Sequence, residues 1–412
     1  MNADVTPASG AGTVREAETS DGRLTIRSTQ PGGNGRVLEI DDDAEPLVVS
    51  LEPETRDSTR RWFYWYVDVE ARFATDLEFR FPHDEVVGPR GPAVRSAMPC
   101  GRPTADGAWE EWRWLGADAR LDAQGFRYGV EADERVQFAL SFPYQRADFD
   151  AFAFGLESDP RVERETLTTT PVGRDVPVLR LGPTDDGRTG EPTGHLVFAA
   201  RHHACESIGS YVLEGVVRGL LEDEAASVLV THRVHVYPFG DLDGVERGDP
   251  GKHRAPHDHN RDYVDANAIA DLEPLYPTTA AVAEDLRSLG ILDLAVDLHC
   301  PYKWGGDIND RPFFVREPAD VSDAVRRLAT TFEAETQGTD LTFDASPGVG
   351  LATFDGQSGL VHAFDRFCRQ LGADPCETFE IPYIGTDADP VTTESARQLG
   401  RGLAVACARV LE

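Results

Sequence analysis

The hydrophobic pattern of the chain changes near residue 150, and this change restricts the folds that the chain can adopt. From Leu24 to Tyr144, short β-branched and aromatic runs alternate with turn residues, without a helical period. Short strands at regular spacing are typical of two packed antiparallel sheets. The expected strands are residues 37–40, 47–51, 62–69, 77–81, 112–115 and 136–142. We therefore predict an all-β sandwich domain over residues 23–147, preceded by a disordered, polar tail over residues 1–22.

Residues 148–412 carry a different pattern, in which strands alternate with helices. The apolar residues Ile208, Val212, Val216 and Leu220 recur every four positions and predict a helix over residues 208–222 with one buried face. The other expected elements are strands at 195–200, 234–237 and 292–298 and helices at 278–289, 321–335 and 393–411. This order predicts an α/β domain with a mixed sheet over residues 148–412.

The charge of the chain limits its partners. Asp and Glu number 72 against 40 for Lys and Arg, and the formal net charge is −32. Such a surface repels nucleic acid and anionic membranes in dilute salt, whereas concentrated salt screens its self-repulsion. We expect an acidic, halophilic-type surface and neither nucleic acid nor membrane as a partner; an ordinary acidic protein is the alternative. The oligomeric state stays open.

The chain shows no signature of membrane insertion or export. No apolar stretch approaches the roughly 20 residues that a spanning helix needs. The amino terminus lacks the basic flank and apolar core of a signal peptide. We therefore expect a cytoplasmic protein. Its six cysteines include no CxxC pair, so reduced thiols are expected, with Cys205 and Cys300 as less favoured metal ligands.

Candidate catalytic residues gather where predicted strands end. His203 and Glu206 form an HxxE motif between an expected strand and an expected helix, and His299 follows the buried strand 292–298. Two histidines and one carboxylate, with water in the fourth position, are typical of an open catalytic zinc site. We predict one zinc ion per chain, held by His203, Glu206 and His299. His202 is a rival for His203, since only the HxxE spacing favours the latter.

Two further groups complete the pattern, namely Asp258-His259-Asn260-Arg261 after the turn 241–244, and Glu377-Thr378-Phe379-Glu380 near the carboxyl end. The order HxxE, DG turn, D-x-N-R, D-x-H and T-F-E resembles the zinc metallocarboxypeptidase family from about residue 175 to the end. The run 138–144, Phe-Ala-Leu-Ser-Phe-Pro-Tyr, is similar to the signature that ends the β-sandwich in the cytosolic carboxypeptidase branch. The resemblance implies a carboxypeptidase-like α/β domain after the sandwich.

The resemblance also implies a role for each matching residue. Zinc would be held by His203, Glu206 and His299, and Asp258 would orient a ligating imidazole. Asn260 and Arg261 would grip the terminal carboxylate of a peptide or protein substrate, Glu380 would be the general base and acid, and Arg254 would polarise the scissile carbonyl. The implied reaction is hydrolysis of a peptide bond by zinc-activated water, releasing a carboxyl-terminal amino acid.

Several alternatives stay open at this point. A zinc amidohydrolase acting on N-acyl amino acids or cell-wall peptides, or a non-catalytic module that retains a metal, would show similar motifs. Residues 357–362 lack the family's mobile tyrosine, for which Tyr383, Tyr302 or His362 could compensate. Glu377 is a rival for Glu380, although we expect it to be a solvated loop acid. The histidines at 253, 257 and 259 could form a second metal site, but we expect hydrogen-bonded or solvated loop residues.

Overall fold

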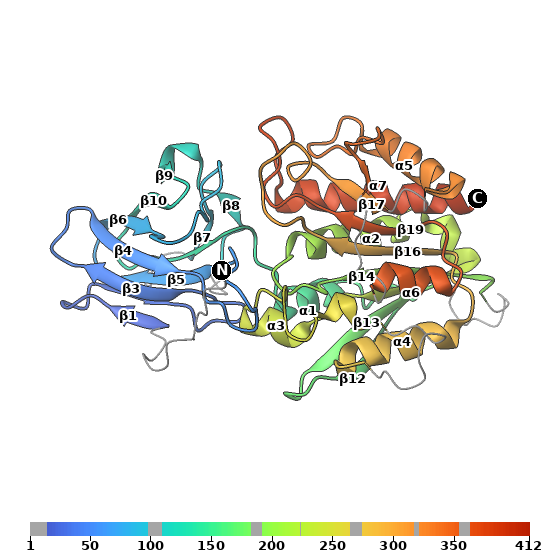
Figure 1. The fold of residues 1–412 in the computed structure, drawn as a ribbon, viewed down its shortest axis with the longest axis horizontal. Coiled ribbons are helices and arrows are strands. Elements are labelled where there is room, and N and C mark those ends of the chain that lie inside the picture. Colours follow the sequence, from blue (N-terminus) through green and yellow to red (C-terminus); the bar gives the residue numbers. More distant parts are fainter. Residues whose placement is uncertain are drawn as a thin grey trace, which may run out of the picture.

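The computed structural model describes residues 15–97, 109–182, 192–222, 224–263, 274–316, 321–353 and 363–412 (Figure 1). Its strands form three sheets, of which two belong to the first part of the chain and one to the rest. None of the described helices is both long and apolar enough to cross a membrane.

The first part of the chain builds two sheets. A six-stranded antiparallel sheet has the order β1 (Glu16–Glu18), β2 (Leu24–Arg27), β5 (Tyr66–Ala71), β11 (Arg135–Ala139), β7 (Ala93–Ala97) and β8 (Arg113–Trp114). A five-stranded sheet has the order β3 (Arg36–Asp41), β4 (Leu47–Glu52), β6 (Thr75–Arg80), β10 (Gly125–Val130) and β9 (Arg120–Asp122), with the short 3-10 helix Ala117–Ala119 before β9. Within it β4 and β6 are parallel, and the other neighbours are antiparallel.

Aromatic side chains join these two sheets. The rings of Phe79 and Phe126, from the five-stranded sheet, lie with their centroids 5.3 and 5.2 Å from that of Phe138 in β11. All three side chains are fully buried. The alternation of apolar residues along each strand places one face of each sheet in this common core.

The second part is built on an eight-stranded mixed sheet. Its order is β12 (Val162–Thr169), β13 (Asp175–Leu181), β15 (His232–Tyr237), β14 (Gly194–Ala200), β16 (Leu294–His299), β19 (Cys376–Glu380), β17 (Phe313–Arg316) and β18 (Leu351–Thr353). The central strands β15, β14, β16 and β19 are parallel. The helices are α1 (Arg146–Phe154), α2 (Ile208–Leu221), α3 (Leu242–Arg247), α4 (Pro277–Leu289), α5 (Asp323–Thr336), α6 (Phe364–Gln370) and α7 (Thr393–Leu411), with short 3-10 helices at Ala226–Val230 and His259–Arg261.

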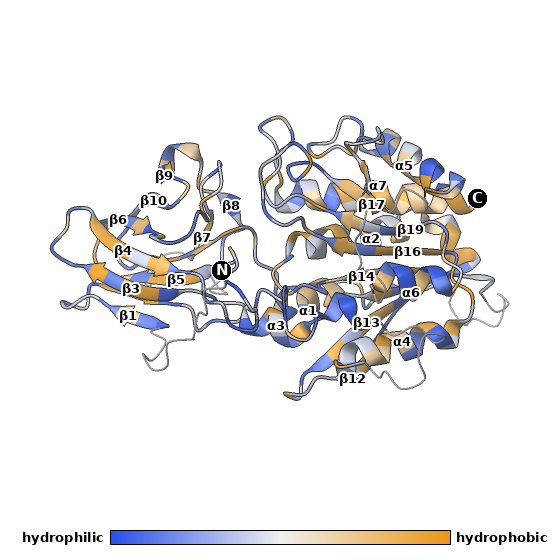
Figure 2. Cartoon of the chain, in the orientation of Figure 1, coloured by the Kyte–Doolittle hydropathy of each residue, from blue (hydrophilic) through white to orange (hydrophobic). Residues whose placement is uncertain are grey.

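Helices cover both faces of this sheet, and Figure 2 shows the hydrophobic colour of β16 in its middle. Leu196 and Phe198 of β14 pack in the core with α2, α5 and α7, whereas Val197 and Ala199 pack in the core with α4 and α6. Successive side chains of a strand point to opposite faces, so a strand buried on both faces reads as a continuous apolar run. A Cβ added to Gly215 of α2 would lie 2.0 Å from the carbonyl oxygen of Arg397, so α2 and α7 are in very close contact.

The structure differs from the expected elements in three places. The tail expected to be disordered up to residue 22 includes β1 at Glu16–Glu18. The strand expected at 62–69 begins only at Tyr66. Trp62 and Phe63 pack against the second part of the chain, whereas Trp65 packs in the core of the first part. The expected boundary between residues 147 and 148 falls inside α1.

Candidate metal centre

The carboxyl ends of three adjacent parallel strands bring the predicted residues together. In the register of the sheet, Ala200 at the end of β14 pairs with Leu298, and His299 at the end of β16 pairs with Glu380 at the end of β19. The loop 201–207 between β14 and α2 carries the HxxE motif. Open α/β sheets place their sites at such carboxyl ends.

The loop of the HxxE motif is fixed by a buried arginine. Arg201 is 1% exposed and adopts a left-handed backbone conformation with φ 61°. Its guanidinium donates hydrogen bonds to the carbonyl oxygens of Ala204 (3.1 Å) and Tyr144 (2.8 Å) and to Oγ of Ser210 (3.2 Å). The loop is thereby tied both to α2 and to the run 138–144, which the sequence analysis singled out.

Glu206 lies between two imidazole rings. Its Oε1 is 3.0 Å from Nδ1 of His203, and its Oε2 is 2.7 Å from Nδ1 of His299. One potential ligand atom from each residue lies within 4.8 Å of the others. Burial raises the pKa of Glu206, but Lys252, His203 and His299 outweigh burial and hold that pKa well below its ordinary range. We call His203, Glu206 and His299 the metal group.

Carboxylates hold the far nitrogen of each imidazole. Nε2 of His203 lies 3.5 Å from Oδ2 of Asp258, and Nε2 of His299 lies 2.7 Å from Oδ2 of Asp297. A carboxylate in this position fixes the ring and makes the other nitrogen a better metal ligand. The sequence analysis gave Asp297 no role, although a D-x-H spacing in a strand places both side chains on one face and was a usable signal.

A second group of potential ligands shares His299 with the metal group. It consists of His202, Asp297 and His299, all buried. Nδ1 of His202 lies 2.8 Å from Oδ1 of Asp297, and Nε2 lies 2.6 Å from the hydroxyl of Tyr263. His202 thus faces a tyrosine hydroxyl with its second nitrogen, whereas His203 has a carboxylate near each of its nitrogens. His203 is therefore the better candidate ligand, because a carboxylate behind an imidazole makes it a better metal ligand.

Glu380 stands beside the metal group with an unused oxygen. Its Oε2 is buried and has no hydrogen-bond partner. Burial and the Glu206 carboxylate raise the pKa of Glu380. A buried carboxylate oxygen without a partner indicates a place for a further polar group, such as a water molecule or a metal ion. Its rival Glu377 is fully buried rather than solvated as expected, and strand alternation places it on the opposite face of β19.

The cation beside the metal group is Lys252, not Arg254. The ammonium of Lys252 contacts Oε1 of Glu206 and donates to the carbonyl oxygen of Cys300 at 3.2 Å. Arg254 instead forms ion pairs with Asp57, Asp241 and Asp249, the last at 3.6 Å. Among the described residues, these contacts do not join Arg254 to the metal group, so they give no support to its predicted role in polarising the scissile carbonyl.

Asn260 and Arg261 differ in their surroundings. Asn260 is 5% exposed, with its Nδ2 3.1 Å from Nε2 of His299 and its Oδ1 accepting a hydrogen bond from the backbone nitrogen of Phe364 at 3.1 Å. The guanidinium of Arg261 donates to the carbonyl oxygen of Asn260 at 3.3 Å, and no carboxylate of the described residues forms an ion pair with it. Arg261, which has no ion-pair partner among the described residues, is the better candidate for binding an anion.

The residues considered as replacements for the mobile tyrosine have other surroundings. Tyr383 is fully buried, with its hydroxyl 3.6 Å from Sγ of Cys205. Tyr302 is 58% exposed and packs edge-on against Trp62. Residue His362 lies outside the described residues. Neither described tyrosine contacts the metal group through a hydrogen bond.

The other alternative ligands are engaged elsewhere. Cys205 and Cys300 are buried, and burial raises the pKa of Cys205 to about 11, which disfavours the thiolate that binds metal. His253 contacts Arg60, His257 lies 2.7 Å from Oδ1 of Asp262, and His259 stacks on Tyr276. Within the described ranges these histidines join no group of potential ligands.

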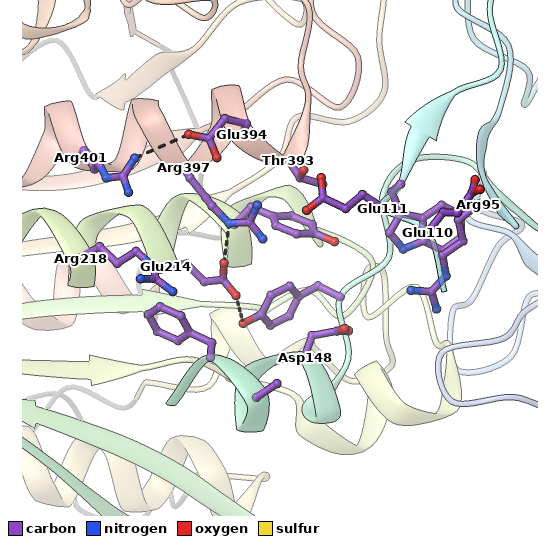
Figure 3. A pocket seen from close by; sticks show the side chains of 15 residues that line it. Arg95, Glu110, Glu111, Asp148, Glu214, Arg218, Thr393, Glu394, Arg397 and Arg401 are labelled. Atoms are coloured by element: carbon purple, nitrogen blue, oxygen red, sulfur yellow. Dashed lines mark hydrogen bonds and ion pairs between the residues drawn. The ribbon is translucent and has the colours of Figure 1, made fainter. Parts of the chain in front are cut away.

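A separate cavity of about 580 Å³ lies between α1, α2, α7 and the β7–β8 region (Figure 3). No residue of the metal group lines it. Glu214, in its centre, accepts hydrogen bonds from the hydroxyl of Tyr144 (2.8 Å) and from Nε of Arg397 (2.7 Å). These paired charges join the helices to the run 138–144, so we attribute a structural role to them.

Solved structures of metallo-carboxypeptidases share this fold. A metallo-carboxypeptidase from Burkholderia cenocepacia matches over 94% of this chain and 99% of its own, with a TM-score of 0.71 and 17% sequence identity. One from Pseudomonas aeruginosa, solved in complex with (2-guanidinoethylmercapto)succinic acid, matches over 94% of this chain and 98% of its own, with a TM-score of 0.71 and 19% identity. A scan against models of protein families and a search of curated proteins find no match. The chain has the fold of the metallo-carboxypeptidases, as the order of its motifs predicted.

Proposed function

We propose that this protein is a zinc-dependent hydrolase that cleaves peptide bonds and releases carboxyl-terminal amino acids. The observation that carries the proposal is the arrangement of the metal group. Nδ1 of His203 and Nδ1 of His299 face the two oxygens of Glu206, while Asp258 and Asp297 hold the far nitrogens. Two imidazoles, one carboxylate and a carboxylate behind each ring are the components of an open catalytic zinc site.

The donor set fits one zinc ion per chain, held by His203, Glu206 and His299. Zinc bound there supplies a Lewis acid that makes a water molecule more acidic and polarises a carbonyl group. Glu380, with its unpartnered Oε2, is placed to accept the proton of the attacking water and to return it to the leaving amine. Its raised pKa, due to burial and to Glu206, suits a group that takes up and releases a proton.

We assign to Lys252 the role that the sequence analysis gave to Arg254. Its ammonium lies against Glu206, and in the proposed reaction it stabilises the negative charge that develops on the carbonyl oxygen of a substrate. Arg261 is the proposed anchor for the terminal carboxylate, because a guanidinium binds both carboxylate oxygens at once. Asn260, the preceding residue, is proposed to share in binding this carboxylate.

The proposed substrate is a peptide or protein with a free carboxyl end. The structurally similar protein from Pseudomonas aeruginosa was solved with a succinic acid derivative, a compound that bears two carboxyl groups. This supports a site that binds a terminal carboxylate. We also propose that the two sheets of the first part form the expected β-sandwich domain. The cytoplasmic location and the halophilic-type surface stay predictions.

The test is release of free amino acids from a peptide library by protein purified at high salt with added zinc. Carboxyl-terminal trimming, blocked by amidation of the peptide ends, supports the proposal, since amidation removes the group that Arg261 would bind. N-Acyl amino acids and cell-wall peptides test the amidohydrolase alternative. Bound zinc without turnover of any of these compounds would favour a non-catalytic module instead.

A further inference from the structure

A segment of the first part of the chain lies along the loop that carries Lys252. Residues 57–62 lie in the connection between β4 and β5, and their backbone and side chains contact residues 252–254 in the second part. Oγ of Ser58 donates to the carbonyl oxygen of Lys252 at 2.5 Å. The backbone nitrogen and Oγ1 of Thr59 both donate to the carbonyl oxygen of His253, at 2.9 and 2.8 Å. These bonds fix the backbone from which the Lys252 side chain projects.

The same segment also covers the Lys252 side chain. The ammonium of Lys252 lies 5.5 Å from the centroid of the Trp62 ring, a cation–π distance. Trp62 is 3% exposed, and its ring packs 4.9 Å from that of His253 and 4.9 Å from that of Tyr302. The Lys252 side chain therefore lies against the Trp62 ring, and its ammonium contacts Glu206 and the carbonyl oxygen of Cys300.

Trp62 acts here through its ring and not through its N–H group. Nε1 of Trp62 is buried and has no hydrogen-bond partner. An unpaired buried donor does not stabilise the position of the side chain. The contacts with Lys252, His253 and Tyr302 are all made by the aromatic face or edge. Another aromatic ring should therefore preserve the arrangement, and an aliphatic side chain should not.

We propose that Trp62 and Ser58 are positioning residues for Lys252, so that the first part of the chain completes the catalytic site in the second part. The segment holds the ammonium between the metal ligand Glu206 and the place of the substrate carbonyl. A flexible lysine side chain loses this direction when its neighbours are removed, because four rotatable bonds separate the ammonium from the backbone. The catalytic consequence rests on the proposed function, whereas the positioning itself does not.

The positioning can be measured without activity, because the chain contains only two lysines, Lys252 and Lys303. The full-length protein, with and without added zinc, is treated with an amine-acylating reagent, and both sites are followed by peptide mass spectrometry. In Trp62→Leu we expect Lys252 to be acylated about tenfold faster than in the wild type, with the rate at Lys303 unchanged. Trp62→Phe should resemble the wild type, and Phe73→Leu, at a 64% exposed ring in the same part of the chain, is the matched control.

Two results would overturn the proposal. One is an unchanged acylation rate of Lys252 in both Trp62→Leu and Ser58→Ala. The other is an equal rise at Lys252 and Lys303, accompanied by a lower melting temperature, which would mean general loosening of the fold. The acylation rates are independent of turnover, so they remain decisive for the positioning even if no substrate is hydrolysed.

Kinetics then connect the positioning with the reaction. We expect Trp62→Leu to lower kcat about tenfold with little change in KM, and to have no further effect in a Lys252→Met background, because residues that act through one group are not additive. Additive losses in the double variant would contradict a role through Lys252 while leaving the proposed hydrolase intact. If the wild type itself lacks activity, the proposed function fails, and the acylation rates alone test the positioning of Lys252.

Discussion

Two buried polar clusters flank the loop of residues 252–261, and they differ in how their charges are balanced. In the metal group, Lys252 and two imidazoles surround the single carboxylate of Glu206. In the other, which we call the Arg254 cluster, three carboxylates (Asp57, Asp241 and Asp249) surround Arg254. The first therefore gathers potential metal ligands and proton carriers around one acid, and the second surrounds one cation with acids.

The difference separates a candidate site from a structural cluster. Beside the metal group, Oε2 of Glu380 is buried and has no hydrogen-bond partner. The two imidazoles of the group are each oriented by a carboxylate behind the ring. Arg254 joins Asp57 of the first part to Asp241, which caps α3, and to Nδ1 of His259 at 2.7 Å. Its partners come from separate elements, so it holds those elements together. Burial and ion pairs occur in both clusters, and the two imidazoles that converge on one carboxylate distinguish the first.

The largest expected effect is that of Glu380→Gln. Removing the proton acceptor should lower kcat by a factor of about 10²–10⁴ while zinc stays bound. Glu377→Gln, on the opposite face of the same strand, is the control and should keep turnover. Steady-state kinetics and elemental analysis of both variants measure this. Equal losses in the two variants would show that the strand, and not the Glu380 carboxylate, is what matters.

The next effect compares Lys252 with its neighbour in sequence. Lys252→Met should lower kcat by about 10²–10³, since it removes a cation placed to stabilise developing negative charge. Zinc content and melting temperature should change little. Lys252→Arg restores the charge and should recover part of the activity. Full turnover in Lys252→Met would show that this residue has no role in the mechanism and that the reaction needs no cation at this position.

Arg254→Met should act on stability instead. It leaves Asp57 and Asp241 buried without their counter-charge, and breaking a buried ion pair costs about 3–5 kcal/mol of unfolding free energy. Chemical denaturation measures this loss, and kcat of the folded fraction should stay close to that of the wild type. A variant of unchanged stability that lacks turnover would return Arg254 to the catalytic role that the sequence suggested.

The smallest effect is a dependence of stability on pH within the Arg254 cluster. Burial and the nearby Asp57 carboxylate raise the pKa of Asp249 to about 6. The folded state thus binds this proton more tightly than the unfolded state, so the stabilisation is present below about pH 4 and is lost as pH rises through about 6. Relative to the wild type, Asp249→Asn should gain about 2–3 kcal/mol of unfolding free energy between pH 4 and pH 7.

Denaturation of both proteins across this pH range provides the measurement. The quantity to follow is the difference in unfolding free energy between variant and wild type, because the ion pairs lost in the variant contribute at every pH. A difference that stays constant or falls as pH rises would contradict the raised pKa.

Periodicity predicted the regular elements of the second part well. The helix expected at 393–411 is α7 (Thr393–Leu411), and the helix expected at 278–289 begins one residue earlier, as α4 (Pro277–Leu289). Gly290 follows α4 with φ 89°, a conformation that favours glycine. For this reason the glycine correctly predicted the end of α4. The prediction of a strand from residue 62 was wrong, because Trp62 and Phe63 lie outside the sheet and pack against the second part. A hydrophobic pattern alone does not indicate which part of the molecule a side chain packs against.

Motif spacing indicated which candidate ligands lie together, but not the cation beside them. His203, Glu206, His299 and Glu380 sit at strand ends or in a short loop, where the sheet fixes their positions. Lys252 and Arg254 sit in an irregular loop in which Gly251 and His253 both have positive φ, at 74° and 52°. A positive φ changes the direction of the neighbouring side chains, and the spacing of residues in the sequence does not reveal this change. The contact of Asp297 with His299 could have been predicted, because the two residues are two positions apart in a strand and so share one face.

The most direct test of the account is zinc content by elemental analysis of the wild type, His203→Ala and His202→Ala. The two histidines are adjacent in sequence, and both belong to groups of potential ligands that share His299. The account predicts about one zinc per wild-type chain, loss of zinc in His203→Ala, and retained zinc with an affinity lowered about 10- to 100-fold in His202→Ala, which loses only the support of Asp297. Zinc that persists in His203→Ala and disappears in His202→Ala would contradict the assignment of the metal group and the mechanism built on it.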